Sequence, residues 1–188
     1  MPAVLASFLA VVLAEMGDKT QLIALTLGLR YRRPWTIMLG ILLATLLNHA
    51  LAAALGAWGG AWLDPRALGW TVGLGFIAFG LWTLVPDRVE TPRERAWGPL
   101  LTTTIVFFTA EMGDKTQLVT VALGARYAAP LTVTIGTTAG MLVADGLAVF
   151  AGSRFASLIP LTLFRRLAAA LFFAFGIASI LGAASAAR

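Results

Sequence analysis

The sequence has no cysteine among its 188 residues, which excludes disulfides and thiolate metal sites. Its single histidine, His49, argues against a zinc or copper site of the usual kind. Charged residues are also scarce at 12%, whereas 59% of the residues are hydrophobic and the mean hydropathy is +0.86. Because a soluble domain is about a quarter charged, this composition predicts an integral membrane protein.

Several signatures are missing as well. The chain contains no G-x-x-x-x-G-K-[ST] sequence, so an ion gradient is the expected source of energy rather than ATP. It contains no H-E-x-x-H pair, which argues against a zinc hydrolase. The first residues, Met1–Ala3, lack the basic segment of a cleaved signal peptide, so we expect the first apolar run to be retained as a membrane span.

Six apolar runs are each long enough to cross a hydrocarbon core of about 30 Å as a helix. The breaks between them contain arginine, proline, aspartate or glycine. The sequence therefore predicts an all-α integral membrane protein with six transmembrane helices. The runs are approximately Ala3–Leu29, Trp35–Trp58, Ala67–Val85, Pro99–Gly124, Leu131–Ala151 and Leu167–Ala184.

One stretch, AEMGDKTQL, begins at Ala14 and occurs again, letter for letter, at Ala110. Over the 18 residues that start at these two positions, 13 are identical, and more distant residues match at the same offset of 96. We therefore expect two three-helix repeats, residues 1–85 and 99–188, joined by a charged loop at 86–98. Because three crossings are an odd number, the second repeat must enter the membrane from the opposite side, which predicts inverted repeats.

The arginines predict the orientation. Nine of the 12 follow the first, third and fifth runs, and the positive-inside rule places that side in the cytoplasm and both termini outside. Since these residues account for most of the net charge of +5, the basic balance indicates a lipid bilayer and no nucleic-acid partner. The nine are Arg30, Arg32, Arg33, Arg88, Arg93, Arg95, Arg154, Arg165 and Arg166.

The duplicated stretch carries the chemistry that stands out most. Acidic and amide residues recur every third position on one helical face, and both copies lie near the middle of a predicted span. Inversion would bring the two faces together, and buried carboxylates must be protonated, paired or bound to cations. Oxygen ligands in this number suit a hard divalent ion such as Ca²⁺ or Mn²⁺. The candidate metal ligands are Glu15, Asp18, Gln21, Glu111, Asp114 and Gln117.

The same stretch leaves two structural questions open. Gly17 and Gly113 either end a helix, with the following aspartate and glutamine forming a capping-box-like start, or are packing contacts between membrane helices. Lys19 and Lys115 either pair with a carboxylate or reach toward the membrane surface.

Three further polar residues lie in the middle of the second and fifth runs. Asp145 is a candidate proton carrier or secondary ligand, and a hydrogen bond between helices is the alternative. His49 could relay protons, although a hydrogen bond to a neighbouring helix fits a lone histidine better. Asn48, next to it, is a secondary candidate for the proton pathway.

The duplicated E-x-G-D-[KR]-[TS] motif, at Glu15–Thr20 and Glu111–Thr116, resembles the signature of the calcium/manganese:proton antiporter family. The resemblance extends over the whole chain and implies exchange of Ca²⁺ or Mn²⁺ for protons, with the motif acids as the cation site and no bound cofactor. Small bacterial members look like manganese exporters. We therefore expect a multi-pass protein of a bacterial plasma membrane that exports Mn²⁺, with Ca²⁺ as the second candidate.

Three other classes remain open at this point. A small-solute exporter, for example for amino acids, could share the six-helix plan. An intramembrane metalloenzyme is less favoured, because catalysis rarely needs equivalent acids from both halves of a duplicated chain. A passive cation channel would use a similar acidic site without coupling metal to protons.

Overall fold

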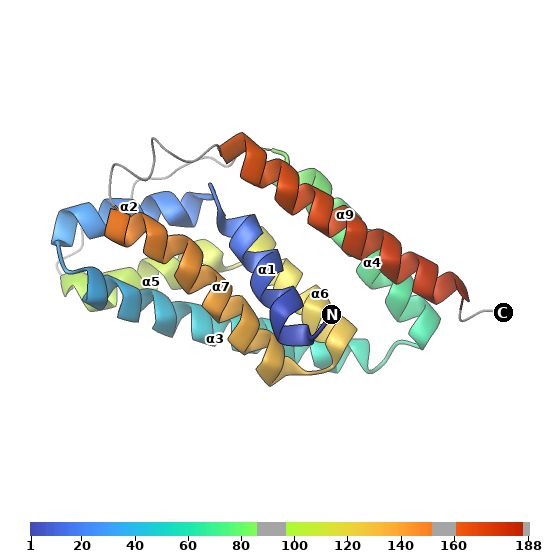
Figure 1. Cartoon of the computed structure of the whole chain (residues 1–188). Helices are drawn as coiled ribbons and strands as arrows, with labels where there is room; N and C mark the ends of the chain where they lie inside the picture. The colour runs from blue at the N-terminus through green and yellow to red at the C-terminus, as the bar shows by residue number, and fades with distance from the viewer. Residues whose placement is uncertain (86–96, 152–160, 186–188) are drawn as a thin grey trace.

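The computed structural model describes residues 1–85, 97–151 and 161–185. These residues form helices and short connections without any strand, which confirms the predicted all-α class (Figure 1). The helices are α1 (Ala3–Glu15), α2 (Lys19–Tyr31), α3 (Pro34–Gly60), α4 (Pro65–Thr83), α5 (Gly98–Glu111), α6 (Lys115–Tyr127), α7 (Pro130–Ala151) and α9 (Leu161–Ser185).

In the described part of the chain, three helices are individually long and apolar enough to cross a membrane: α3, α7 and most of α9. The last helix begins at Leu161, six residues before the predicted start at Leu167. Arg165 and Arg166 therefore lie in the helix and not in the loop before it. Apolar residues precede this pair, and arginine side chains on a helix can extend toward the membrane surface, so two adjacent charges do not end the helix.

The first and fourth predicted spans are each broken into two helices. The break between α1 and α2 occurs at Gly17, where φ is +88°, and the break between α5 and α6 occurs at Gly113, where φ is +76°. Glycine is the residue that adopts this left-handed conformation without strain. The interpretation of these two glycines as packing contacts is therefore wrong, and each one ends a helix.

The helices pack in two equivalent groups. Helix α3 lies along α5 and α6, with Gly40 against Thr103 and Gly124 against Ala53 (Figure 1). Helix α7 lies along α1 and α2 in the same way, with Gly136 against Ser7 and Gly28 against Val149. Every residue in the second group is related to one in the first by 96 positions. Glycine at these contacts lets the helix backbones approach closely.

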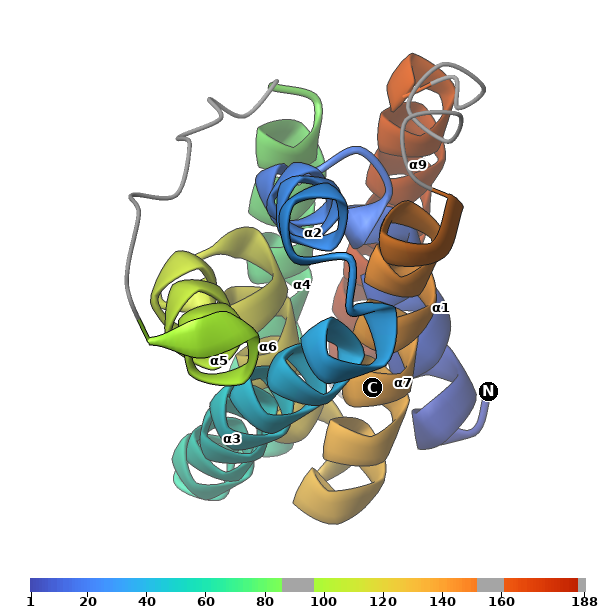
Figure 2. The same cartoon turned by 90° about the vertical axis from the view of Figure 1, so that its left-hand side faces the viewer.

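The order of these contacts defines the two ends of the bundle. At one end, Gly136 near the start of α7 contacts Val4 of α1, and Gly69 near the start of α4 contacts Ala183 near the end of α9. At the other end, Gly40 near the start of α3 contacts Leu100 near the start of α5. Figure 2 shows the bundle from the end at which α2 is followed by α3, with α4 behind α2 and α9 off to one side. The start of α1 and the end of α9 thus lie at the same end.

Two apolar clusters lie on either side of the middle of the bundle. The first includes Ile37 and Ile41 from the first half of α3 and Leu27 from α2. The second includes Ala53 from the second half of α3 and Leu123 from α6. Polar residues of α3 and α7 fall between the clusters. The bundle therefore holds a polar layer between two apolar ones.

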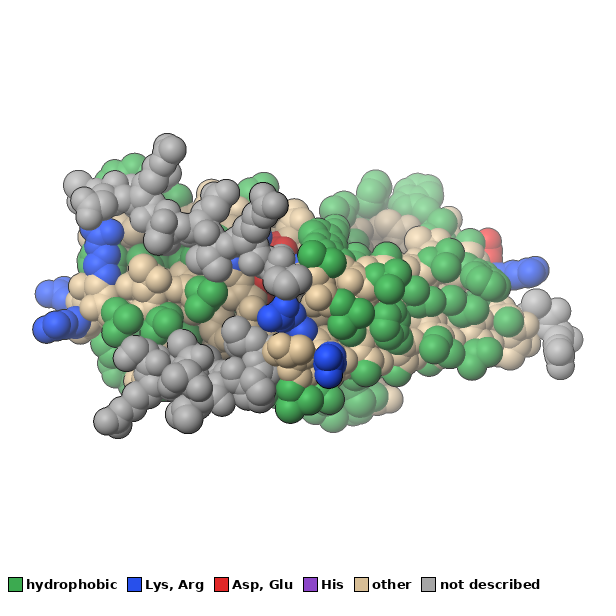
Figure 3. Space-filling model, turned by 90° about the horizontal axis from the view of Figure 1, so that it is seen from above, with side chains coloured by type: hydrophobic (Ala, Val, Ile, Leu, Met, Phe, Trp, Pro, Cys, Tyr) green, Lys and Arg blue, Asp and Glu red, His purple; other side chains and the backbone are tan. Residues whose placement is uncertain are grey.

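The outer surface is unusually apolar. Figure 3 shows hydrophobic side chains over much of one face, with lysines or arginines visible at both ends and near the middle. All six tryptophans are exposed, namely Trp35, Trp58, Trp62, Trp70, Trp82 and Trp97. Exposed leucines and tryptophans at this density are typical of a surface that faces lipid.

We predict that Gly113→Ala weakens folding. An alanine at a φ of +76° is strained by about 1–2 kcal/mol, and the free energy of unfolding in detergent should fall by that amount. The matched control is Gly182→Ala in α9, where an added Cβ meets nothing within 4 Å, so helix propensity alone predicts no loss. Equal losses for both variants would contradict the requirement for a left-handed residue at the break.

Candidate functional site

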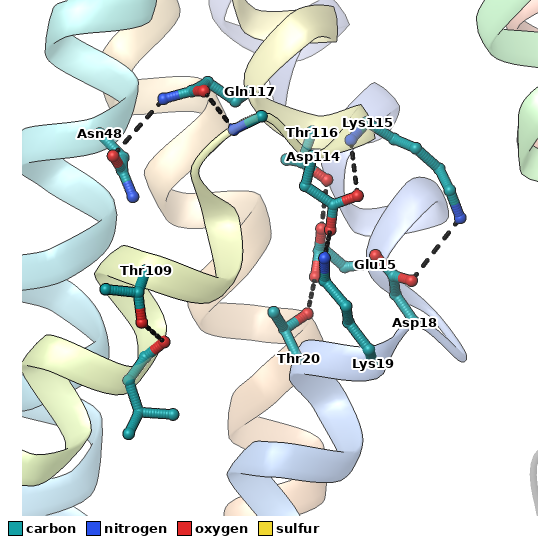
Figure 4. A network of polar contacts seen from close by, with 12 residues as sticks. Glu15, Asp18, Lys19, Thr20, Asn48, Thr109, Asp114, Lys115, Thr116 and Gln117 are labelled. Atoms are coloured by element: carbon teal, nitrogen blue, oxygen red, sulfur yellow. Dashed lines mark hydrogen bonds and ion pairs between the residues drawn. The ribbon is translucent and has the colours of Figure 1, made fainter. Parts of the chain in front are cut away.

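The two helix breaks place the duplicated motif at the centre of the bundle. Helix α1 ends at Glu15 and α2 begins at Lys19, and α5 and α6 divide the second copy in the same way. Figure 4 shows residues of the two copies facing each other across a short distance. The four motif acids are all buried. The structure thus brings together the acidic residues that the sequence placed 96 positions apart.

Two ion pairs cross between the motif copies. The ammonium nitrogen of Lys19 lies 3.0 Å from Asp114 Oδ2, and that of Lys115 lies 3.7 Å from Asp18 Oδ1 (Figure 4). Each lysine therefore pairs with the aspartate of the other copy, which confirms the pairing interpretation of both lysines. A buried aspartate requires such a counter-charge, because the hydrocarbon region does not solvate it.

Glu15 accepts hydrogen bonds from both copies. Thr20 Oγ1 donates to Glu15 Oε2 at 2.5 Å, and Thr116 Oγ1 donates to Glu15 Oε1. Our reading of the sequence did not include these threonines among the site residues. The only available signal was that each one stands within the duplicated motif, since spacing alone does not show that a hydroxyl of one copy reaches a carboxylate of the other.

Glu111 occupies the equivalent position but has different contacts. Among the described residues, neither of its carboxyl oxygens has a hydrogen-bond partner, and the side chain is fully buried. It lies within electrostatic reach of Glu15 and Asp145, as well as of both motif aspartates. Identical sequences therefore give unequal surroundings, because one glutamate takes both threonine hydroxyls and the other takes neither.

The two glutamines stabilise the helix breaks. Gln21 Oε1 accepts from the Gly17 N–H at 2.9 Å, and Gln117 Oε1 accepts from the Gly113 N–H at 2.7 Å. In a capping box the glutamine oxygen accepts from the backbone N–H of the N-cap aspartate. Here it accepts from the glycine that precedes the aspartate, one residue earlier in the chain than predicted. The Gln21 amide also donates to the Ala144 carbonyl at 2.8 Å, which ties α2 to α7.

Asn48 links α3 to the second break. Its amide donates to the Phe108 carbonyl of α5 at 3.0 Å, and its oxygen lies 3.5 Å from the Gln117 amide of α6. The residue at the equivalent position of α7 is Ala144, whose carbonyl takes the Gln21 amide. The structure therefore gives Asn48 a bridging role between three helices.

Asp145 and His49 are equivalent residues of α7 and α3, and both are fully buried. In the part of the chain that the structure describes, neither the carboxyl oxygens of Asp145 nor the ring nitrogens of His49 have a hydrogen-bond partner. The interpretation of either residue as a structural hydrogen-bonding group is therefore wrong for this conformation. Asp145 lies within electrostatic reach of Glu15 and Glu111, so it belongs to the same acidic cluster.

The predicted ligands do not converge on a single point in this conformation. Among the described residues, no three His, Cys, Asp or Glu side chains are grouped closely enough to hold a metal ion. The lysines pair with the two aspartates, and the glutamine oxygens accept from the backbone. The arrangement holds five acids and two lysines in one buried region, where further cations or protons are needed to balance the charge.

Comparison with known proteins identifies the family. The sequence model of the family described as "Divalent cation/proton antiporter GDT1" matches residues 3–91 and again residues 99–187. No solved structure matches the chain.

Three relatives illustrate the similarity. The "Putative manganese exporter" of Vibrio cholerae is 45% identical over 92% of this chain and 88% of its own length. A GDT1-like protein of Synechocystis is 27% identical over 95% of this chain and 97% of its own. The chloroplastic PAM71-homolog of Arabidopsis thaliana is 31% identical over 94% of this chain and 58% of its own. The chain belongs to the GDT1 family of divalent cation/proton antiporters and is an integral membrane transporter, not an enzyme.

Proposed function

We propose that this protein exports Mn²⁺ from the cytoplasm in exchange for protons, with Ca²⁺ as the second candidate ion. The observation that carries the proposal is the meeting of two acidic motifs at the buried centre of a divalent cation/proton antiporter. The relative from Vibrio cholerae, named for manganese export, supports the choice of ion. Because the chain belongs to a family of divalent cation/proton antiporters, we no longer consider the amino-acid exporter and the metalloenzyme as alternatives.

The cation site in this proposal consists of Glu15, Asp18, Glu111 and Asp114. Carboxylate oxygens are the ligands that Mn²⁺ and Ca²⁺ prefer, and both motif copies contribute equally. Gln21 and Gln117 serve as additional ligands, because an amide oxygen that accepts one N–H keeps a second lone pair. Binding then requires the aspartates to leave their lysines and the four carboxylates to close around the ion.

Competition for oxygen couples the metal to protons. A carboxylate binds a metal only in its deprotonated form. A proton that arrives from one side therefore promotes release of the metal, and departure of the proton allows a metal ion to bind again. Asp145 is our candidate for an additional proton carrier. It is buried, has no hydrogen-bond partner and lies within electrostatic reach of both motif glutamates.

For the architecture we propose six crossings: α1 with α2, α3, α4, α5 with α6, α7 and α9. Residues 1–85 and 99–188 are then inverted repeats joined by the charged segment 86–98. The matching of helix contacts at an offset of 96 supports this arrangement. The lengths of the helices also support it. Helices α1 and α2 have 13 residues each, or about 20 Å, so only the two together are long enough to cross a core of about 30 Å.

Orientation follows from the basic residues in this proposal. Three exposed arginines lie where α2 ends and α3 begins, namely Arg30, Arg32 and Arg33. Arg66 lies at the opposite end of the bundle. We place the first group in the cytoplasm and both termini outside. Four further arginines on which the orientation was based, Arg88, Arg93, Arg95 and Arg154, lie outside the described residues.

The function predicts that each motif acid is needed for coupled exchange. In proteoliposomes with a proton gradient, the purified chain should drive radioactive Mn²⁺ against its concentration gradient while protons move in the opposite direction, so that internal pH rises as Mn²⁺ enters. Removing one buried charge from a shared site should lower the rate by about 100-fold. The variants are Glu15→Gln, Glu111→Gln, Asp18→Asn and Asp114→Asn.

The control is Asp64→Asn, which changes an exposed acid that caps α4 and leaves an amide able to cap in its place. Its rate should equal that of the unmodified protein. If Glu111→Gln kept full activity while Glu15→Gln had none, the two copies would not share one site. Metal flux that ignores the proton gradient would indicate a channel.

The architecture makes a separate prediction about labelling. Because the chain has no cysteine, single cysteines can be introduced without background. Ala61→Cys, just after α3, should react with a membrane-impermeant maleimide added to intact cells, and Val85→Cys, just after α4, should not. Both residues are exposed, so a lack of reaction reflects sidedness and not burial. Reaction at both positions would contradict an odd number of crossings between them.

A further inference from the structure

The crossed lysine pairs, which must open before the ion binds, also set the charge balance at the two aspartates. Lys19 and Lys115 bring two positive charges to Asp18 and Asp114, and one divalent cation carries the same total charge. The two aspartates can therefore be neutralised equally by two ammonium groups or by one metal ion. The identical spacing in both motif copies makes this substitution symmetrical.

We propose that Lys19 and Lys115 are tethered competitors of the transported cation and set its affinity and valence. This inference rests on the proposed function. In the absence of metal the ammonium groups hold the aspartates, and the ion must displace them to bind. Lysine suits this role because its charge is compact and lies at the end of a flexible stem, so it can leave and return without a change in the backbone.

The surroundings of the lysines allow such a displacement. The Lys19 side chain is 28% exposed, so its ammonium group has a route away from Asp114 toward the surface. The Lys115 side chain is only 4% exposed, but its nitrogen lies 6.0 Å from the centre of the Trp82 ring on α4. An aromatic face attracts a cation at this range, which gives Lys115 a second favourable contact besides Asp18.

Displacement of the two lysines by the charge of the ion also explains a preference for divalent cations. A divalent ion that enters between the aspartates replaces both ammonium groups and leaves the charge of these two aspartates balanced. A monovalent ion can replace only one of them, and the second aspartate then keeps its lysine. The tethered lysines thus favour divalent over monovalent cations, independently of the size of the ion.

The test is isothermal titration of Mn²⁺ into the purified full chain at one fixed pH, with Na⁺ as the competing ion. Removal of one competitor by Lys19→Gln or Lys115→Gln should tighten Mn²⁺ binding about tenfold, as expected for a close charge pair. The same variants should become sensitive to Na⁺, whereas the unmodified chain should not. Lys115→Arg keeps the charge and should stay near the unmodified affinity.

The matched control is Arg126→Gln, which removes a positive charge from an exposed position near the end of α6 and should change neither affinity nor Na⁺ sensitivity. Thermal unfolding checks that each variant is folded. If Lys115→Gln does not fold, Lys19→Gln decides alone, because its side chain is partly exposed. Unchanged or weaker Mn²⁺ binding in folded Lys19→Gln would overturn the inference, whereas no binding by the unmodified chain would contradict the proposed function instead.

Discussion

The cost of placing carboxylates in a medium that does not solvate them governs the centre of this protein. Five acids lie buried, four of them within electrostatic reach of the fifth, Glu111, and each of the surrounding features reduces that cost. Two lysines neutralise the aspartates, and two threonine hydroxyls solvate one glutamate. The remaining acids, Glu111 and Asp145, have no such contacts with any described residue, so they are the groups where protons or metal have most to contribute.

The helix breaks make this chemistry possible. In a continuous helix the backbone N–H groups bond internally, and the side chains of Glu15 and Asp18 follow the same helical face. The break at Gly17 lets the side chains of Glu15 and Asp18 point in different directions. It also leaves the Gly17 N–H without a partner within the helix, and this N–H donates to the Gln21 side chain instead. The same glutamine bonds to the backbone of α7, so the geometry of the break depends on the neighbouring helix. The motif therefore supplies its charges together with the backbone geometry that presents them.

Much of this could be predicted from the sequence, because the relevant signals are local or repeated. The duplication, the burial of the acids and the pairing of the lysines follow from exact repetition and from the cost of a buried charge. Which aspartate each lysine pairs with does not follow from the sequence. Lys19 lies next to Asp18 in the chain yet pairs with Asp114, and only the packing of the two copies decides that.

Other features depended on the environment of single residues. His49 was expected to be hydrogen-bonded, and for Asp145 a hydrogen bond was the alternative to a role as proton carrier or ligand, because buried polar groups usually have partners. Within the described part of the chain, neither side chain has one. The early start of α9 was missed because Arg165 and Arg166 resemble a loop in a sequence, although their long side chains are compatible with a helix end near a membrane surface.

The unequal surroundings of Glu15 and Glu111 have a consequence for the conformational equilibrium. Because the motif copies are identical from Ala14 to Leu22 and from Ala110 to Leu118, exchanging the roles of the two glutamates would produce an arrangement with the same types of contact. The contacts within the motif therefore favour neither arrangement by themselves, and the residues that differ between the repeats, such as His49 and Asp145, set the populations together with a bound ion. A duplicated sequence thereby protects a carrier against becoming trapped on one side of its cycle.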